Sequence, residues 1–180
     1  METELSPTSY VVLGMLGLGA KTGYDIKGIV DKSTRFFWAA SYGQIYPELR
    51  RLENAGLVKG KLAPTGGRKR KTYELTDDGR RVLAQWGAAQ PRMPELRDEN
   101  LLKLFFADLL PREHGLEQLR MRRRGHEEFL AFLREVAARG DGDDDPVFVS
   151  LVLNYGIEYA EWNIEWCKKH ERRLSAKEAA

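Results

Sequence analysis

The sequence predicts a mainly α-helical protein with one small β-hairpin. Apolar residues recur at helical spacing along most of the chain, which favours amphipathic helices. Residues 57–63 and 71–76 instead alternate polar and apolar side chains, as strands do, and a glycine-containing turn connects them. Only helical patterns follow residue 91. We therefore expect a first domain over residues 1–90 and a second, wholly helical domain over residues 91–180.

The first two helices are indicated by the residues that precede them. Ser6 can cap a helix whose first residue is Pro7, since an N–H group at that position would have no partner within the helix. Thr22 begins a second helix, with Asp25 three residues later. The aromatic run Phe36–Trp38 follows, and it is too apolar for a free loop. We expect it to fill the gap between the two domains.

The segment from Ser41 to Val58 carries the clearest helical signal. Its apolar stripe falls at Ile45, Leu49 and Leu52. Ser41 and Gln44 have the spacing of a capping box, which marks the helix start. The outer face of this helix is polar and net basic.

A strongly basic hairpin is predicted directly after that helix. From Lys59 to Tyr73 there are six basic residues and no acidic one. A helix with a polar outer face followed by a basic hairpin is the layout of a winged helix-turn-helix, in which the helix enters a major groove of DNA and the hairpin lies on phosphates. The predicted partner is double-stranded DNA.

The remaining elements are helices. Thr76 can cap a fourth helix whose first turn holds two aspartates, and its expected buried side is formed by Val82, Leu83 and Trp86. Three further helices are expected near residues 98–109, over 111–139 and from 146 to about 173.

The last helix carries an unusual apolar stripe. Its members are spaced at helical intervals, and they are Leu151, Tyr155, Tyr159, Trp162 and Trp166. Because no large domain remains to cover it, we expect this stripe to bind a second copy of the chain. The alternative that it packs only within its own chain stays open.

The segments AASYGQIYPELRRLENAGLV and GGRKRKTYELTDDGRRVL resemble the N-terminal domain of the PadR family of bacterial transcriptional regulators, and the likeness extends over about residues 13–83. FFWAAS resembles the branch that includes the virulence activator AphA. The resemblance implies a winged-helix DNA-binding domain joined to a C-terminal helical dimerisation domain. It further implies control of transcription, and we expect a homodimeric repressor of a pseudo-palindromic operator.

Candidate contacts to DNA follow from this layout. Base readout is expected from the start of the third helix, at Ser41, Tyr42 and Gln44, because a glutamine can pair with an adenine. Phosphate contacts are expected from Tyr24, Tyr46, Arg50 and Arg51. The hairpin contact is assigned to Arg68, Lys69, Arg70 and Lys71. Some PadR-like regulators hold flat aromatic effectors between subunits, and here Trp162 and Trp166 are the residues that such a ligand would stack on.

Composition limits the other classes of function. Residues 1–90 hold 14 Lys and Arg against 9 Asp and Glu, and residues 91–180 hold 15 against 18, so the first half is the basic one. The single cysteine excludes an intrachain disulfide, and no long apolar run indicates a membrane span, which together favour the cytoplasm. No spacing suits a metal, a cofactor or an enzyme nucleophile. The remaining rival is a winged-helix module that binds a protein and no DNA.

Overall fold

The structure is a computed structural model of the whole chain, and it describes residues 5–63, 70–91, 93, 95–139 and 146–176. The chain divides into two compact units, Met1–Arg92 and Met93–Ala180.

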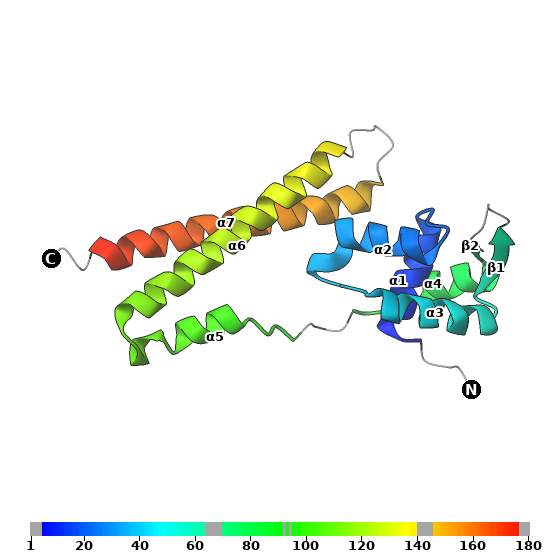
Figure 1. Cartoon of the computed structure of the whole chain (residues 1–180), viewed down its shortest axis with the longest axis horizontal. Coiled ribbons are helices and arrows are strands. Elements are labelled where there is room, and N and C mark those ends of the chain that lie inside the picture. The colour runs from blue at the N-terminus through cyan, green and yellow to red at the C-terminus, as the bar shows by residue number, and fades with distance from the viewer. Residues whose placement is uncertain (1–4, 64–69, 92, 94, 140–145, 177–180) are drawn as a thin grey trace. The chain divides into compact units, whose positions relative to one another are not determined.

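Over its described residues, the N-terminal unit contains four α-helices and the hairpin, in the order of a winged helix (Figure 1). Its elements are α1 (Pro7–Gly17), α2 (Gly23–Lys32), a 3-10 turn (Thr34–Phe36), α3 (Tyr42–Asn54), β1 (Val58–Ala63), β2 (Arg70–Leu75) and α4 (Asp77–Ala88). The mainly α-helical fold with one hairpin is confirmed. The helix starts agree with their caps: the Ser6 side chain accepts a hydrogen bond from the N–H of Ser9, and Thr22 and Asp25 form a capping box.

The core of this unit joins three helices and the base of the hairpin. The apolar stripe of α3 is fully buried against α1 and α2, and the innermost side chains are Val12, Leu13, Ile26, Val30, Ile45, Leu49 and Leu52. Each fully buried aliphatic side chain of this kind contributes about 1.5–3 kcal/mol. This packing holds α3 against the body of the unit with its polar side outward.

The hairpin is tied to the helices by backbone hydrogen bonds. β1 and β2 are antiparallel, with Val58 opposite Leu75. The N–H of Tyr73 in β2 donates to the carbonyl of Lys21, 2.8 Å away, in the loop after α1. The base of the hairpin is therefore fixed beside the start of α2.

One expectation about α4 is wrong. Val82 and Leu83 pack against the core, but the Trp86 side chain is 52% exposed. Its ring stacks on Tyr10 of α1 with centroids 4.7 Å apart. Trp86 lies in the last turn of α4, beyond the core residues that cover the helix start. The expected role of Phe36–Trp38 between the domains stays a prediction.

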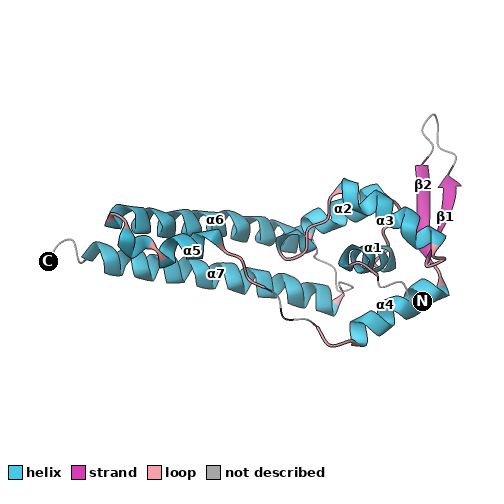
Figure 2. Ribbon diagram, turned by 90° about the horizontal axis from the view of Figure 1, so that it is seen from below, coloured by secondary structure: helices cyan, strands magenta, loops and turns pink. Residues whose placement is uncertain are grey.

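Every regular element of the C-terminal unit that the structure describes is helical. It comprises α5 (Glu99–Phe105), a 3-10 turn (Ala107–Leu109), α6 (Arg112–Arg139) and α7 (Val147–Ala176). The predicted short helix near residues 98–109 is thus an α-helix followed by a separate turn. The two long helices pack along each other (Figure 2). In the part of the chain that the structure describes, no helix is both long and apolar enough to span a bilayer.

A partly buried ion pair joins α5, α6 and α7. Arg122 of α6 pairs with Asp98, the N-cap of α5, at 2.7 Å. The same guanidinium donates to the side-chain oxygen of Asn163 in α7 at 2.9 and 3.1 Å. Because both partners satisfy its donors, the arginine can be nearly buried without a large energetic penalty.

Candidate DNA interface

The first turn of α3 presents the residues predicted to read bases. Ser41, Tyr42 and Gln44 are all exposed. The backbone N–H of Ser41 donates to the Gln44 side-chain oxygen at 2.9 Å, so the capping box is present. This bond orients the Gln44 amide at the helix start. An adenine contact by Gln44 would therefore compete with the cap for that oxygen.

Tyrosines form a continuous outer surface across α2 and α3. Tyr42 and Tyr46 stack with ring centroids 6.1 Å apart, and each is about two-fifths exposed. The Tyr46 ring lies against Gly23, where an added Cβ would come within 2.7 Å of it. Tyr24, the next residue of α2, is 67% exposed. These side chains offer hydroxyl donors and flat apolar faces to a partner.

Lys27 belongs to this surface and was not among the predicted contacts. Its ammonium lies 5.7 Å from the centre of the Tyr42 ring, and it pairs with Asp31 one turn along α2. The sequence signal was its position three residues after Tyr24, on the same side of the helix. The i, i+4 pairing with Asp31 is also the pattern of an ordinary surface ion pair, so this signal was weak.

The two predicted phosphate-binding arginines of α3 have different environments. Arg50 is exposed. Arg51 instead points to Glu48, with Nη2 2.7 Å from Oε1 and Nε 3.1 Å from the same oxygen, and Nη2 also donates to the Ser9 hydroxyl at 2.6 Å. The structure thus engages the Arg51 donors within the domain.

Glu48 is a nearly buried carboxylate that these contacts keep charged. Burial alone would raise its pKa, but hydrogen bonds from Arg51 and Ser9 and the charge of Arg51 outweigh burial, so the pKa is lowered from 4.5. The negative charge is retained at neutral pH inside the contact between α1 and α3.

Of the predicted hairpin contacts, the structure describes the side chain of Lys71. Lys71 pairs with Glu53 at the end of α3, 2.6 Å away, and its ammonium lies 5.4 Å from the Tyr73 ring centre. The hydrogen bond to Glu53 raises the pKa of Lys71. Arg68 and Lys69 lie outside the described residues, and Arg70 is described only as part of β2. The Lys71–Glu53 pair therefore links β2 to the tyrosine side of α3.

The predicted dimerisation stripe is on the outside of the C-terminal unit. Leu151, Tyr155 and Trp162 are each more than three-fifths exposed, and Tyr159 is 40% exposed. Trp162 stacks on the half-buried Trp166, with centroids 6.4 Å apart. The opposite side of α7 is buried against α6. An apolar surface of this extent is typical of a protein interface.

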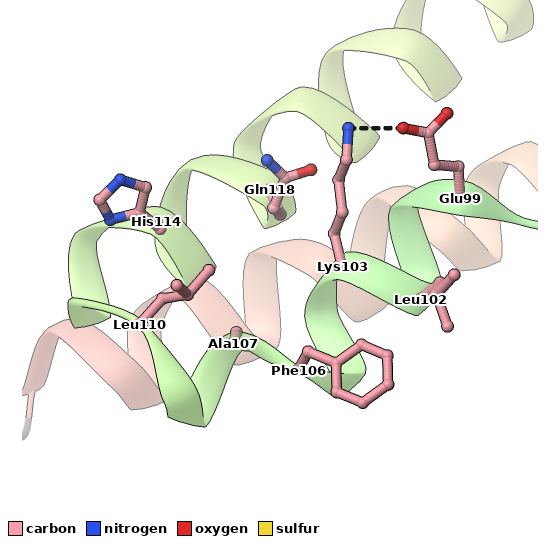
Figure 3. A pocket seen from close by; sticks show the side chains of 8 residues that line it. All are labelled: Glu99, Leu102, Lys103, Phe106, Ala107, Leu110, His114 and Gln118. Atoms are coloured by element: carbon pink, nitrogen blue, oxygen red, sulfur yellow. Dashed lines mark ion pairs between the residues drawn. The ribbon is translucent and has the colours of Figure 1, made fainter.

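A pocket of about 450 Å³ opens between α5, the following turn and α6 (Figure 3). Its walls are largely apolar, and the residues that line it are Glu99, Leu102, Lys103, Phe106, Ala107, Leu110, His114 and Gln118. Lys103 and Glu99 form an ion pair of 2.8 Å at its edge. Neither Trp162 nor Trp166 lines this pocket. Over the described residues, no cluster of His, Cys, Asp or Glu has the arrangement of a metal site.

Two family models match the chain, one for each unit. Residues 12–85 match the transcriptional regulator PadR-like family. Residues 96–175 match the model described as virulence activator alpha C-term.

Individual relatives match over nearly the full length. The chain is 28% identical over 166 residues to the negative transcriptional regulator PadR of Bacillus subtilis, covering 87% of this chain and 91% of the relative. The crystal structure of the Bacillus subtilis PadR in complex with operator DNA superposes with a TM-score of 0.84 at 27% identity, covering 94% of this chain and 99% of the other.

Two further solved structures are similar over both units. The same Bacillus subtilis protein in complex with p-coumaric acid gives a TM-score of 0.76 at 27% identity, over 93% of this chain and 98% of the other. The virulence activator AphA of Vibrio cholerae gives a TM-score of 0.72 at 26% identity, covering 94% of this chain and 98% of the other.

Proposed function

Because the chain belongs to the PadR-like family of transcriptional regulators, we propose that it represses transcription by binding a pseudo-palindromic operator as a homodimer in the cytoplasm. The observation that carries the proposal is the surface of tyrosines and cations that runs from the start of α2 across α3 to Lys71 of β2. Its likeness to a relative solved on operator DNA supports the same docking mode.

The contacts divide between base reading and phosphate binding. Ser41, Tyr42 and Gln44 lie at the helix start that enters a major groove in this fold, so they read bases. Tyr24, Tyr46 and Arg50 contact phosphates, and the hairpin adds Arg68, Lys69, Arg70 and Lys71. Lys27 joins the phosphate contacts, since it lies over Tyr42 on the same surface.

The homodimer forms through the exposed stripe of α7. A C2 interface places the same patch on both partners, and a flat row of aromatic side chains suits such self-association. Dimerisation through the C-terminal domain, residues 91–180, leaves the N-terminal domain, residues 1–90, available to occupy a half-site.

An aromatic carboxylic acid is the effector class that we propose. The Bacillus subtilis relative was solved with p-coumaric acid, which is flat and carries one carboxylate. The stack of Trp162 on Trp166 is one candidate site. The pocket beside α5 is the other, because its walls are apolar and Lys103 at its edge offers a charge partner.

Two variants distinguish effector binding at these two candidate sites. They are Trp162→Phe for the tryptophan stack and Ala107→Leu for the pocket. Binding at the tryptophan stack quenches tryptophan fluorescence and is weakened by Trp162→Phe alone. Binding in the pocket raises the melting temperature and is weakened by Ala107→Leu, which fills it. A titration with p-coumaric acid that gives neither saturable signal refutes the effector proposal.

Selection of binding sites from random duplex DNA tests the DNA-binding proposal. Two symmetric half-sites with centres about 10 base pairs apart are expected, as two recognition helices on one face of the duplex require. Failure to enrich any sequence, together with no retention of duplex at low salt, refutes it and favours a protein-binding winged helix.

A further inference from the structure

Helix α3, the proposed recognition helix, has two flanks that make different contacts. Tyr42, Tyr46 and Glu53 recur at helical spacing on the flank beside α2 and the hairpin. Glu48 and Arg51 lie on the other flank, which packs on the first turn of α1. The outer face of α3, which is expected to meet DNA, thus lies between these two flanks.

The apolar stripe of α3 determines which side of the helix is buried. Ile45, Leu49 and Leu52 are fully buried, so the polar side of the helix faces outward. Hydrophobic burial is not directional, whereas hydrogen bonds weaken steeply when their angles change. A directional contact on one flank can therefore fix the rotation of the helix more finely than the apolar stripe does.

Ser9, Glu48 and Arg51 provide such a contact. Ser9 is fully buried in α1 and donates its hydroxyl hydrogen to Glu48, while Arg51 binds Glu48 through Nε and Nη2. Glu48 also lies at the N-terminal end of α1, where the helix dipole favours a carboxylate. Moving Arg51 away leaves the nearly buried charge of Glu48 without its ion-pair partner, which is costly.

We propose that Ser9, Glu48 and Arg51 form a clamp that sets the rotation of the recognition helix, so that Arg51 is a positioning residue and not a phosphate contact. The proposal rests on the DNA-binding function proposed above. Loosening the clamp misaligns the base-reading residues Ser41 and Gln44 while leaving the cationic surface in place. The affinity for the specific operator should therefore fall more than the affinity for non-specific DNA.

Four variants of the full chain test the clamp. Glu48→Gln removes the carboxylate charge with little change in shape. Arg51→Lys keeps the positive charge but loses the forked guanidinium, and Arg51→Met loses both. Arg50→Met, at the neighbouring exposed position, is the matched control for a phosphate contact.

The first readout is affinity for the selected operator and for a shuffled duplex of the same composition, across a salt series. The clamp predicts that Glu48→Gln, Arg51→Lys and Arg51→Met each lower the ratio of specific to non-specific affinity by about tenfold or more, as for a mismatched base pair. It also predicts an unchanged salt slope for non-specific binding. Arg50→Met should instead weaken both duplexes similarly and reduce the slope by about 0.9 for each phosphate that is no longer neutralised.

Two results overturn the proposal. If Arg51→Lys binds like the parent while Arg51→Met loses affinity and slope on both duplexes, Arg51 is a phosphate contact. The second result is a fall in melting temperature for all the Glu48 and Arg51 variants with no change in the ratio of specific to non-specific affinity. The contacts among Ser9, Glu48 and Arg51 then stabilise the fold but do not position the base-reading residues.

A measurement without DNA separates the clamp from the proposed function. In the free chain, Glu48→Gln should speed amide hydrogen exchange in α3 by about tenfold or more relative to α2, since the helix is held less firmly. Unchanged exchange in α3 overturns the clamp whether or not duplex is bound. Accelerated exchange in a chain that binds no duplex refutes the DNA-binding function but leaves the clamp as the determinant of the α3 position.

Discussion

At the residue scale, Gly79 shows how closely α4 approaches the hairpin. A Cβ at this position would lie 2.1 Å from the carbonyl oxygen of Leu57, which is backbone and cannot move aside. Gly79→Ala should therefore lower the free energy of unfolding by at least about 2 kcal/mol, as overpacking does. Gly87→Ala in the same helix meets no atom within 4 Å and is the control. Equal unfolding midpoints for the two variants in urea would contradict this close contact.

Glu48 makes the stability of the protein depend on pH in a defined direction. Its pKa is lowered in the folded state, so its stabilising contribution is complete above the ordinary value of 4.5 and is lost as pH falls through the folded pKa. The difference in unfolding free energy between the parent and Glu48→Gln should therefore shrink below about pH 4.5. Urea titrations from pH 7 to pH 3 measure this difference in unfolding free energy. A difference that grows on acidification would contradict the lowered pKa of Glu48 in the folded state.

Arg51 illustrates what sequence could not predict at this scale. Its spacing from Ile45 placed it beside the polar face of the helix, which is correct, and a basic side chain there suggested a phosphate contact. Its partner Ser9 is 42 residues away and belongs to another helix. No local pattern signals that contact, because it exists only after α1 and α3 have packed.

At the element scale, the start of α3 and the hairpin should contribute differently to DNA binding. Gln44→Ala should change the preference among operator variants, whereas Lys69→Ala should weaken all duplexes similarly and lower the salt slope by about 0.9 for each phosphate that it neutralises. Competition binding against single-base operator variants at several salt concentrations distinguishes the two. Indistinguishable effects of the two variants would refute the proposal that the start of α3 reads bases while the hairpin binds phosphates.

The stripe of α7 predicts the effect of a new charge on assembly. Trp162→Glu places a carboxylate in the middle of the proposed interface, where its desolvation is unfavourable, so dimers should dissociate at micromolar concentration. Asn154→Glu adds the same charge to α7 at an exposed position off the stripe and is the control. Light scattering after gel filtration gives the mass of each variant. A dimeric Trp162→Glu would exclude this face as the interface.

The elements themselves were largely predictable because their signals are local. Ser6, Thr22 and Ser41 each precede the first residue of a helix, and the two predicted strands are paired. The exposure of Trp86 was missed, since periodicity identifies the side of a helix but not how far along it the core extends. The pocket beside α5 was missed for a related reason. It depends on how a short helix and a separate turn lie on α6.

At the scale of the whole molecule, the two units combine different chemistry in one chain. The N-terminal half carries the excess of positive charge and an outer surface of tyrosines, and the C-terminal half carries the excess of negative charge and an exposed aromatic stripe. Family models match both halves, which confirms the resemblance that the sequence of α3 and the hairpin suggested. One half thus suits a polyanion, and the other suits a second copy of the chain.

The most direct test of this account is an equilibrium titration of the full chain onto its selected duplex, with the mass of the complex measured across a salt series. We expect two chains on each duplex and an affinity that falls steeply with salt, with a log–log slope of about −0.9 for each phosphate neutralised. A chain that stays monomeric, or one that ignores duplex DNA even in dilute salt, would contradict it.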